Sequence, residues 1–141
     1  MTMQDIIQID STGNIIQYKN VLVAAFMILM GIGIAAIWTI DIIKGTFRDQ
    51  GNFFNWKNEG GDLMWPHIFA EYSTGILLLI AGIAILTEMS WADKFAYFPL
   101  GALAYTSLNS LGWTFVMRER YGYAVPMVIG FVGSIVCVLI L

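Results

Sequence analysis

Four long stretches without any Asp, Glu, Lys or Arg residue constrain this chain more than any other feature. They run over 21–40, 72–87, 95–117 and 121–141 and together cover more than half of the 141 residues. A soluble domain places charge on each amphipathic element, so that one face meets water while the other packs. Here only 12% of the residues are charged, against about 25% in soluble domains. The sequence therefore argues against a soluble globular domain.

The length of these stretches predicts transmembrane helices. A helix rises ~1.5 Å per residue and the hydrocarbon layer is ~30 Å thick, so about 20 apolar residues cross it. The second stretch reaches this length only if its helix starts near Trp65. Continuous apolar runs favour helices over membrane strands, which alternate between lipid and lumen. We predict an all-α fold, a four-helix transmembrane bundle with short loops and one longer aromatic-rich loop after the first helix. Residues 1–141 form one integral membrane domain, with helices at about 21–43, 65–87, 95–117 and 121–141.

The positions of the cations predict an orientation. Lys19 and Lys94 lie on one side of the predicted membrane, and the other five cations lie in the loops after the first and third helices. Cytoplasmic loops carry an excess of Lys and Arg. We therefore expect a multi-pass protein of the cytoplasmic membrane with both termini outside. Asp5 and Asp10 precede the first apolar stretch and argue against a cleavable signal peptide.

Two segments outside the predicted spans leave alternatives open. The tail repeats Ile-Ile-Gln at 6–8 and 15–17, around the turn formers of 11–14. This pattern favours either a hairpin on the membrane surface or a frayed tail whose isoleucines enter the headgroup layer. The segment 41–64 is rich in glycine and aromatic residues. We favour interfacial anchoring by its rings over a lid that covers the end of the bundle.

One carboxylate lies well inside a predicted span. If the second helix starts near Trp65, Glu71 sits ~9 Å along the helix axis. A charge at that depth is unfavourable by a few kcal/mol or more, so Glu71 should be protonated, paired or in contact with water. His67 precedes Glu71 by four residues, which places both side chains on the same helix face. The two residues form a candidate polar pair.

The third predicted helix offers partners for this pair. Tyr105, Asn109 and Trp113 follow one another at intervals of four and form one stripe, with Thr106 and Ser110 beside it. Counted from the helix ends, Asn109 lies ~12 Å inside the membrane, close to the level of Glu71. An asparagine amide can donate a hydrogen bond to a carboxylate. We therefore expect a polar pocket near one membrane surface, and its candidate residues are His67, Glu71, Asn109, Tyr105 and Trp113.

Two interpretations of this pocket remain open. His67, Glu71 and Asn109 can fix the register of neighbouring helices, at about 0.6 kcal/mol per contact in membrane proteins. Alternatively, a titratable pair within the membrane binds a ligand, passes protons or holds a cation.

Several other functions are disfavoured. One histidine in the chain cannot build a bis-histidine haem or a histidine-rich metal site in a single subunit. The net charge of −3 argues against nucleic acid as a partner, because phosphate binding needs clustered cations. No serine elbow, glycine-rich phosphate loop or HExxH motif occurs. We therefore predict no cofactor and no metal, and the chain is more consistent with a non-enzymatic role, although it is compatible with a subunit of a membrane enzyme.

Small residues are spaced for close packing of helices. Gly31 and Ala35 are four residues apart in the first predicted helix, and Gly130 and Ser134 are four apart in the last. Small residues at this spacing let helix backbones approach closely within membranes. We expect both pairs to lie at helix contacts.

Two motifs carry a resemblance to known proteins. The run Pro-His-Ile-Phe-Ala-Glu-Tyr-Ser-Thr-Gly over 66–75 opens the second predicted helix, and Asn-Ser-Leu-Gly over 109–112 ends the third. In these features the chain resembles small prokaryotic four-helix integral membrane proteins of no established function. The resemblance covers the second to fourth helices and implies a four-helix bundle. It lends weight to His67, Glu71 and Asn109 and brings no activity.

The first functional expectation is a structural or accessory subunit of a membrane complex, or a homo-oligomer. Its partners would be the lipid bilayer and other membrane subunits or copies of itself, because most of the chain's surface lies within the membrane. The alternative is a ligand-binding or proton-coupled transport protein that uses Glu71 with His67. An oxidoreductase membrane anchor that contacts haem or quinone through His67 ranks lowest.

Overall fold

The computed structural model describes residues 3–44, 64–116 and 122–141, and all regular structure within them is helical. The four helices are α1 (Met3–Lys44), α2 (Met64–Leu86), α3 (Ala92–Val116) and α4 (Ala124–Ile140). Side chains are described from Tyr18 onward, except those at 64, 65, 113 and 116. The prediction of an all-α fold with four helices is confirmed for this part of the chain. The bounds of α2, α3 and α4 differ from the predicted ones by no more than three residues.

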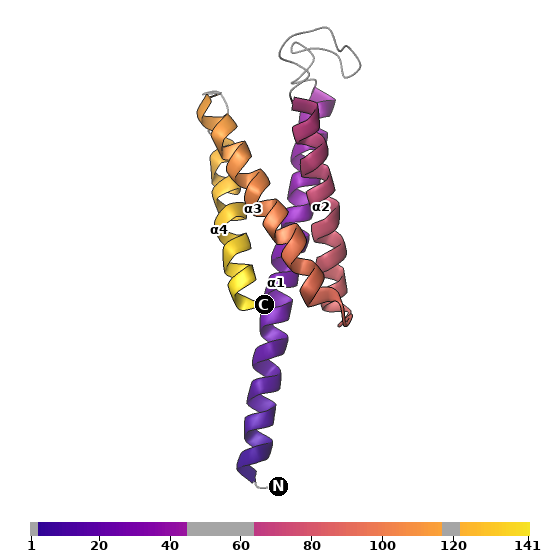
Figure 1. Ribbon diagram of the computed structural model, residues 1–141, viewed down its shortest axis with the longest axis vertical. Helices are drawn as coiled ribbons and strands as arrows, with labels where there is room; N and C mark the ends of the chain where they lie inside the picture. Colours follow the sequence, from indigo (N-terminus) through magenta and orange to yellow (C-terminus); the bar gives the residue numbers. More distant parts are fainter. Residues whose placement is uncertain (1–2, 45–63, 117–121) are drawn as a thin grey trace.

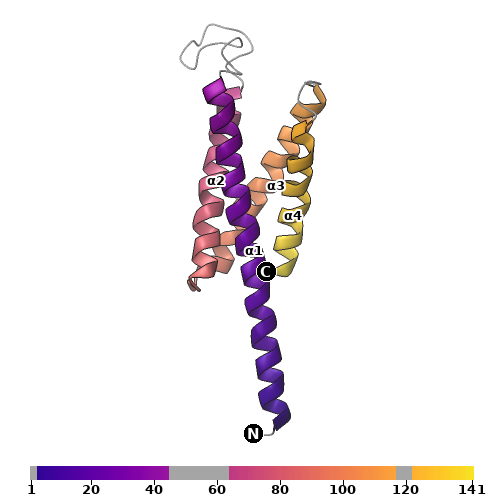
Figure 2. The ribbon, with the colours of Figure 1, turned by 180° about the vertical axis from the view of Figure 1, so that it is seen from behind.

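The N-terminal tail departs from both predictions made for it. α1 begins at Met3 rather than near residue 21, so neither a surface hairpin nor a frayed tail forms over 3–17. An existing helix extends at little further penalty per residue, and the tail contains one weak breaker, Gly13, and no proline. Figures 1 and 2 show the N-terminal part of α1 projecting beyond the ends of the other three helices. The predictions for the aromatic segment fall mainly on 45–63, outside the described residues.

α1 and α2 pack along matching seams. Buried positions on both helices recur at alternating intervals of three and four residues, which is the spacing of a helix pair that packs side by side. On α1 the series is Met27, Gly31, Ile34, Trp38 and Asp41, and on α2 it is Ile68, Glu71, Gly75, Leu78 and Gly82. Val23 and Ala24 of α1 and Thr74, Ala81, Ala84 and Ile85 of α2 are buried beside it. Where the backbones meet, a Cβ added to Gly31 would lie 2.7 Å from the Gly75 carbonyl oxygen. Gly31 is therefore at a helix contact, as predicted.

A short turn leads from α2 into α3. The Met89 amide donates to the Ala84 carbonyl at 3.0 Å, and the Glu88 amide donates to the Ile85 carbonyl at 3.0 Å. Together with the left-handed backbone of Glu88, whose φ is 54°, these two bonds form the Schellman arrangement that ends helices. The turn therefore stops α2 without proline or glycine.

α3 links the two sides of the bundle. It packs on α2 and on α4, while α1 and α4 contact each other less; Figures 1 and 2 show it crossing from the end of α2 toward α4. Because α3 starts at Ala92, Pro99 lies inside the helix. Pro66 and Pro126 lie in the first turns of α2 and α4, where a missing amide hydrogen has no intrahelical partner to lose.

α4 docks through a narrow stripe of small residues. Its buried residues are Gly130, Ser134 and Cys137, spaced by four and three positions. The predicted pair of Gly130 and Ser134 thus lies at a helix contact. A Cβ on Gly130 would lie 2.5 Å from Ser107 Oγ of α3 and 3.0 Å from Met30 Cε of α1.

The buried Cys137 provides a test of this docking. Its side chain is 5% exposed, so we expect slow labelling by a membrane-permeant maleimide. Gly130→Leu should push α4 away from Ser107 and make Cys137 react at least about tenfold faster. A decrease of about 1.4 kcal/mol in the free energy of local opening raises the open fraction tenfold. Gly112→Leu is the matched control, since a Cβ on Gly112 would meet nothing within 4 Å. Equal labelling rates in both variants would contradict the observed packing of α4.

Candidate functional site

Five polar or hydrogen-bonding side chains from three helices form one cluster. We call it the polar cluster, and it consists of Trp38 from α1, His67 and Glu71 from α2, and Asn109 and Ser110 from α3. It lies toward the end of the bundle where α1 ends and α2 begins. His67 and Glu71 occupy successive turns of the same α2 face, because they are four residues apart. The cluster therefore joins α2 to both of the helices packed against it.

Glu71 is the buried centre of the polar cluster. Its side chain is almost fully enclosed, with the residue 2% exposed. The Ser110 hydroxyl donates to Oε1 at 2.8 Å, and the Trp38 indole nitrogen donates to Oε2 at 3.4 Å. Both carboxylate oxygens thus have a donor from another helix. This arrangement meets the requirement that a buried carboxyl group be hydrogen-bonded.

His67 connects Glu71 to the outer edge of the cluster. Its Nε2 lies 2.9 Å from Ser110 Oγ, and its Nδ1 lies 3.1 Å from the Asn109 side-chain nitrogen. Nε2 is also 3.7 Å from Glu71 Oε1. The ring meets the edge of the Trp38 indole at a centroid distance of 5.6 Å. Both ring nitrogens of His67 are therefore hydrogen-bonded.

These contacts determine the tautomer of His67. An amide nitrogen only donates, so Nδ1 must accept from Asn109. The Ser110 hydroxyl has one hydrogen, which it gives to Glu71, so Oγ accepts from His67. The ring proton of His67 therefore lies on Nε2, and the imidazole is neutral in this arrangement.

The structure brings together three of the five predicted pocket residues. His67, Glu71 and Asn109 all belong to the polar cluster, but Asn109 contacts His67 rather than Glu71. The carboxylate is met by Ser110, the next residue along α3. The site residues of α2 and α3 thus lie at matching depths, as predicted. However, the α3 residue that meets Glu71 is Ser110 and not its neighbour Asn109.

Tyr105 lies outside the polar cluster, in contrast to the prediction. Its side chain is 71% exposed. The buried stripe of α3 follows Leu103, Thr106, Ser107, Ser110 and Thr114. Tyr105 and Asn109 lie along the border of that stripe or beyond it, because each residue turns about 100° around the helix. Trp113 lies within α3, but its side chain is outside the described part of the chain.

Two members of the cluster were not predicted as site residues. The sequence pattern puts Ser110 only beside the polar stripe and does not single out Trp38. A buried tryptophan usually finds a hydrogen-bond acceptor for its indole N–H, so Trp38 within an uncharged stretch was itself a signal. Trp38 also precedes Asp41 by three residues, which places both on the same face of α1.

Further polar contacts surround the cluster at the same end of the bundle. The Tyr123 hydroxyl donates to Asp41 Oδ1 at 3.3 Å, which links the start of α4 to the end of α1. Thr39 Oγ1 lies 2.6 Å from the Tyr72 hydroxyl and adds a bond between α1 and α2. Polar contacts between helices are therefore concentrated at this end.

The geometry of the polar cluster limits its chemistry. Ser110 and His67 are within hydrogen-bond distance, as a nucleophile and its base would be. However, the Ser110 proton points to Glu71, and Nδ1 of His67 faces an amide rather than a carboxylate. Within the described residues no three His, Cys, Asp or Glu side chains are grouped to hold a metal ion. What the arrangement can do is hold a proton or pass it along its hydrogen bonds.

Comparison with known families gives one match. Residues 16–141 match the family described as a domain of unknown function, DUF8058. This region includes α2, α3 and α4 in full and every residue of the polar cluster. No curated protein and no solved structure matches the chain.

Proposed function

The chain belongs to the DUF8058 family, and for this member we propose a role as a small integral membrane protein. It crosses the bilayer four times and acts as a structural or accessory subunit of a membrane assembly. The assembly consists of other membrane chains or of copies of the same chain.

The distribution of side chains on α3 is the observation that carries this proposal. α3 buries hydroxyl groups and exposes large apolar and aromatic rings, the reverse of a helix that faces water. The buried residues include Thr106, Ser107, Ser110 and Thr114, and the exposed ones are Tyr97, Phe98, Tyr105, Leu108 and Phe115. Thr106 and Thr114 donate to carbonyl oxygens of their own helix, at 3.3 and 2.7 Å. Hydroxyls satisfied in this way suit a helix surrounded by lipid.

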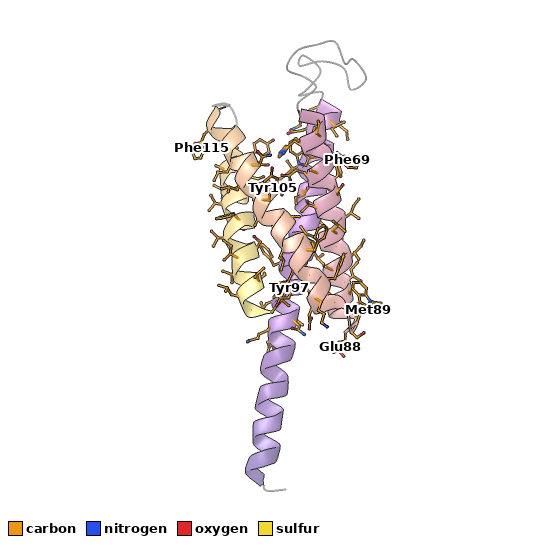
Figure 3. The ribbon with its side chains drawn as sticks, in the orientation of Figure 1. Phe69, Glu88, Met89, Tyr97, Tyr105 and Phe115 are labelled. Atoms are coloured by element: carbon orange, nitrogen blue, oxygen red, sulfur yellow. The ribbon has the colours of Figure 1, made fainter. Side chains whose placement is uncertain are left out.

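The other helices agree with a membrane environment. Tyr18–Lys44 and Pro66–Leu86 are long and apolar enough to cross a bilayer, and Ala124–Ile140 is apolar but shorter. Figure 3 shows Phe69 of α2 and Phe115 of α3 at the outer sides of the bundle. Such exposed apolar surface on every helix requires lipid or partner helices to cover it.

The distribution of polar groups supports the proposed role as a subunit. The members of the polar cluster bond to one another, whereas the outer surface of α4 is aliphatic. Its exposed residues include Val125, Val128, Ile129, Val132, Ile135, Val136, Val138 and Leu139. This surface therefore offers apolar contacts to lipid and to other chains within the bilayer.

Extraction and native purification test the proposal together. We expect the protein to stay in the membrane pellet after alkaline carbonate treatment and to need detergent for release. Purified from native membranes in mild detergent, it should migrate as an assembly larger than one chain, with a constant ratio of components. Release by carbonate would contradict membrane insertion, and a monomer after mild extraction would contradict the role as a subunit.

A second candidate function is favoured by one feature of the polar cluster. Its hydrogen bonds form an unbroken series from the exposed Asn109 to the buried Glu71, which suits a proton-coupled or ligand-binding membrane protein. Glu71→Gln should then abolish a proton-dependent activity in a protein that still folds. Contact with haem through His67 is disfavoured, because both ring nitrogens are already hydrogen-bonded.

A further inference from the structure

We propose that His67, Ser110 and Glu71 form a proton relay, with Asn109 at its entrance, that protonates the buried carboxylate from the exposed edge of α3. The inference rests on the proposed membrane insertion, because water is then confined to the edge of the bundle. It does not depend on whether the chain is a subunit or a proton-coupled protein.

Every hydrogen bond from His67 to Glu71 can reverse its direction. In the arrangement described above, Asn109 donates to His67 Nδ1, His67 Nε2 donates to Ser110, and Ser110 donates to Glu71 Oε1. Imidazole and hydroxyl groups each donate and accept, and a carboxyl group does both once protonated. The Trp38 indole only donates, so it cannot take part in transfer, and the series ends at Glu71.

One proton entering at His67 therefore moves through the series as follows. The Asn109 amide first turns its N–H away from Nδ1, the proton from water then binds Nδ1, and the Nε2 proton passes to Ser110 Oγ. The Ser110 hydroxyl proton then passes to Glu71 Oε1. The products are a neutral carboxylic acid, a serine hydroxyl and an imidazole that carries its proton on Nδ1. The Asn109 amide rotates so that its oxygen accepts from Nδ1, and one proton has been taken up.

Burial increases in the direction of transfer. Asn109 is exposed, His67 is partly buried, and Ser110 and Glu71 are buried. Contacts that only fix helix register need no exposed end, whereas a relay needs one end in water and the other enclosed. The distances between successive polar atoms are 3.1, 2.9 and 2.8 Å, each short enough for a hydrogen bond.

Other titratable groups near this end have their own contacts. Asp41 of α1 is bonded to Tyr123 of α4 at 3.3 Å. Among the described residues, Glu71 is in contact with the polar groups of Trp38 from α1, His67 from its own helix and Ser110 from α3. No side chain of α4 is hydrogen-bonded to Glu71 among the bonds of the described residues.

Infrared spectroscopy of the full chain in oriented phosphatidylcholine bilayers tests the relay. After a drop in pH, the carbonyl band of a protonated carboxyl group should appear in the wild type and be missing in Glu71→Gln. Ser110→Ala should slow its appearance by about tenfold or more, which corresponds to a barrier raised by about 1.4 kcal/mol. Ser110→Thr, which keeps the hydroxyl, should restore the rate, and Ser107→Ala should leave it unchanged.

A second variant, His67→Gln, tests the relay if the Ser110→Ala protein does not fold. His67→Gln retains a donor and an acceptor but lacks a ring that binds a proton at one nitrogen and releases it from the other, so it should also slow protonation. Unchanged rates in both folded variants, or no Glu71 band at any pH, would overturn the relay. Amide dichroism of the same films reports helix orientation separately, so helices lying outside the membrane would instead contradict the proposed function.

Discussion

Glu71→Ala should lower the free energy of unfolding in detergent micelles by about 3 kcal/mol or more. The substitution removes the acceptor of both the Ser110 hydroxyl and the Trp38 indole N–H. It also leaves a cavity at a position that is 2% exposed. The loss of stability from two unsatisfied donors adds to the loss from the cavity. Both weaken the contacts of α2 with α1 and α3, which meet at this side chain. Titration with sodium dodecyl sulfate, followed by tryptophan fluorescence, measures the loss.

The controls separate hydrogen bonding from volume. Glu71→Gln keeps the side-chain size and one oxygen acceptor, so it should lose only about 1 kcal/mol. Ser107→Ala changes a buried serine on the same face of α3, outside the polar cluster, and should have a smaller effect. A Glu71→Ala protein as stable as the wild type would show that the carboxylate does not hold the helices together.

The positions of α2, α3 and α4 could be predicted from the sequence, because they depend on the charge and the length of each stretch by itself. A stretch such as 121–141 has no charge to place in water, so its secondary structure follows from its own composition. α4 accordingly begins and ends within three residues of the prediction. The tail shows where this reasoning fails. The turn formers of 11–14 favour a hairpin locally, but the continuing α1 helix makes each added residue easier to include.

The sequence predicted how far along the helices the site residues lie, but not which face of α3 points toward Glu71. Counting residues from the ends of the spans placed Glu71 and Asn109 at similar levels, because the rise per residue is constant. Which residue of α3 faces Glu71 depends on how α3 packs against α2 and α4 together. That rotation brought Ser110 to the carboxylate and left Tyr105 outside. Periodicity within one helix does not contain this information.

The packing of α1 against α2 can be tested sharply, because two glycines only two positions apart on α1 differ in their contacts with α2. Gly31→Ala should lower the free energy of unfolding by about 1–3 kcal/mol. The added Cβ would lie 2.7 Å from the Gly75 carbonyl oxygen and 2.9 Å from Leu79 Cγ. A backbone oxygen cannot move aside without shifting α2, so the two helices must separate.

Gly33→Ala is the matched control, because a Cβ there would meet nothing within 4 Å. It should be neutral or stabilising by up to about 1 kcal/mol, since alanine has a higher helix propensity than glycine. Gly82→Ala should fall between the two, because its added Cβ would lie 2.8 Å from Ile28 Cγ1 and 3.0 Å from the Ala24 carbonyl oxygen, a less severe backbone contact than the one at Gly31. The order of stability measured in the same denaturant titration should therefore be Gly33→Ala, then Gly82→Ala, then Gly31→Ala. Equal effects at positions 31 and 33 would mean that α1 presents a different face to α2, and the Trp38 contact with Glu71 on that same face would then fail with it.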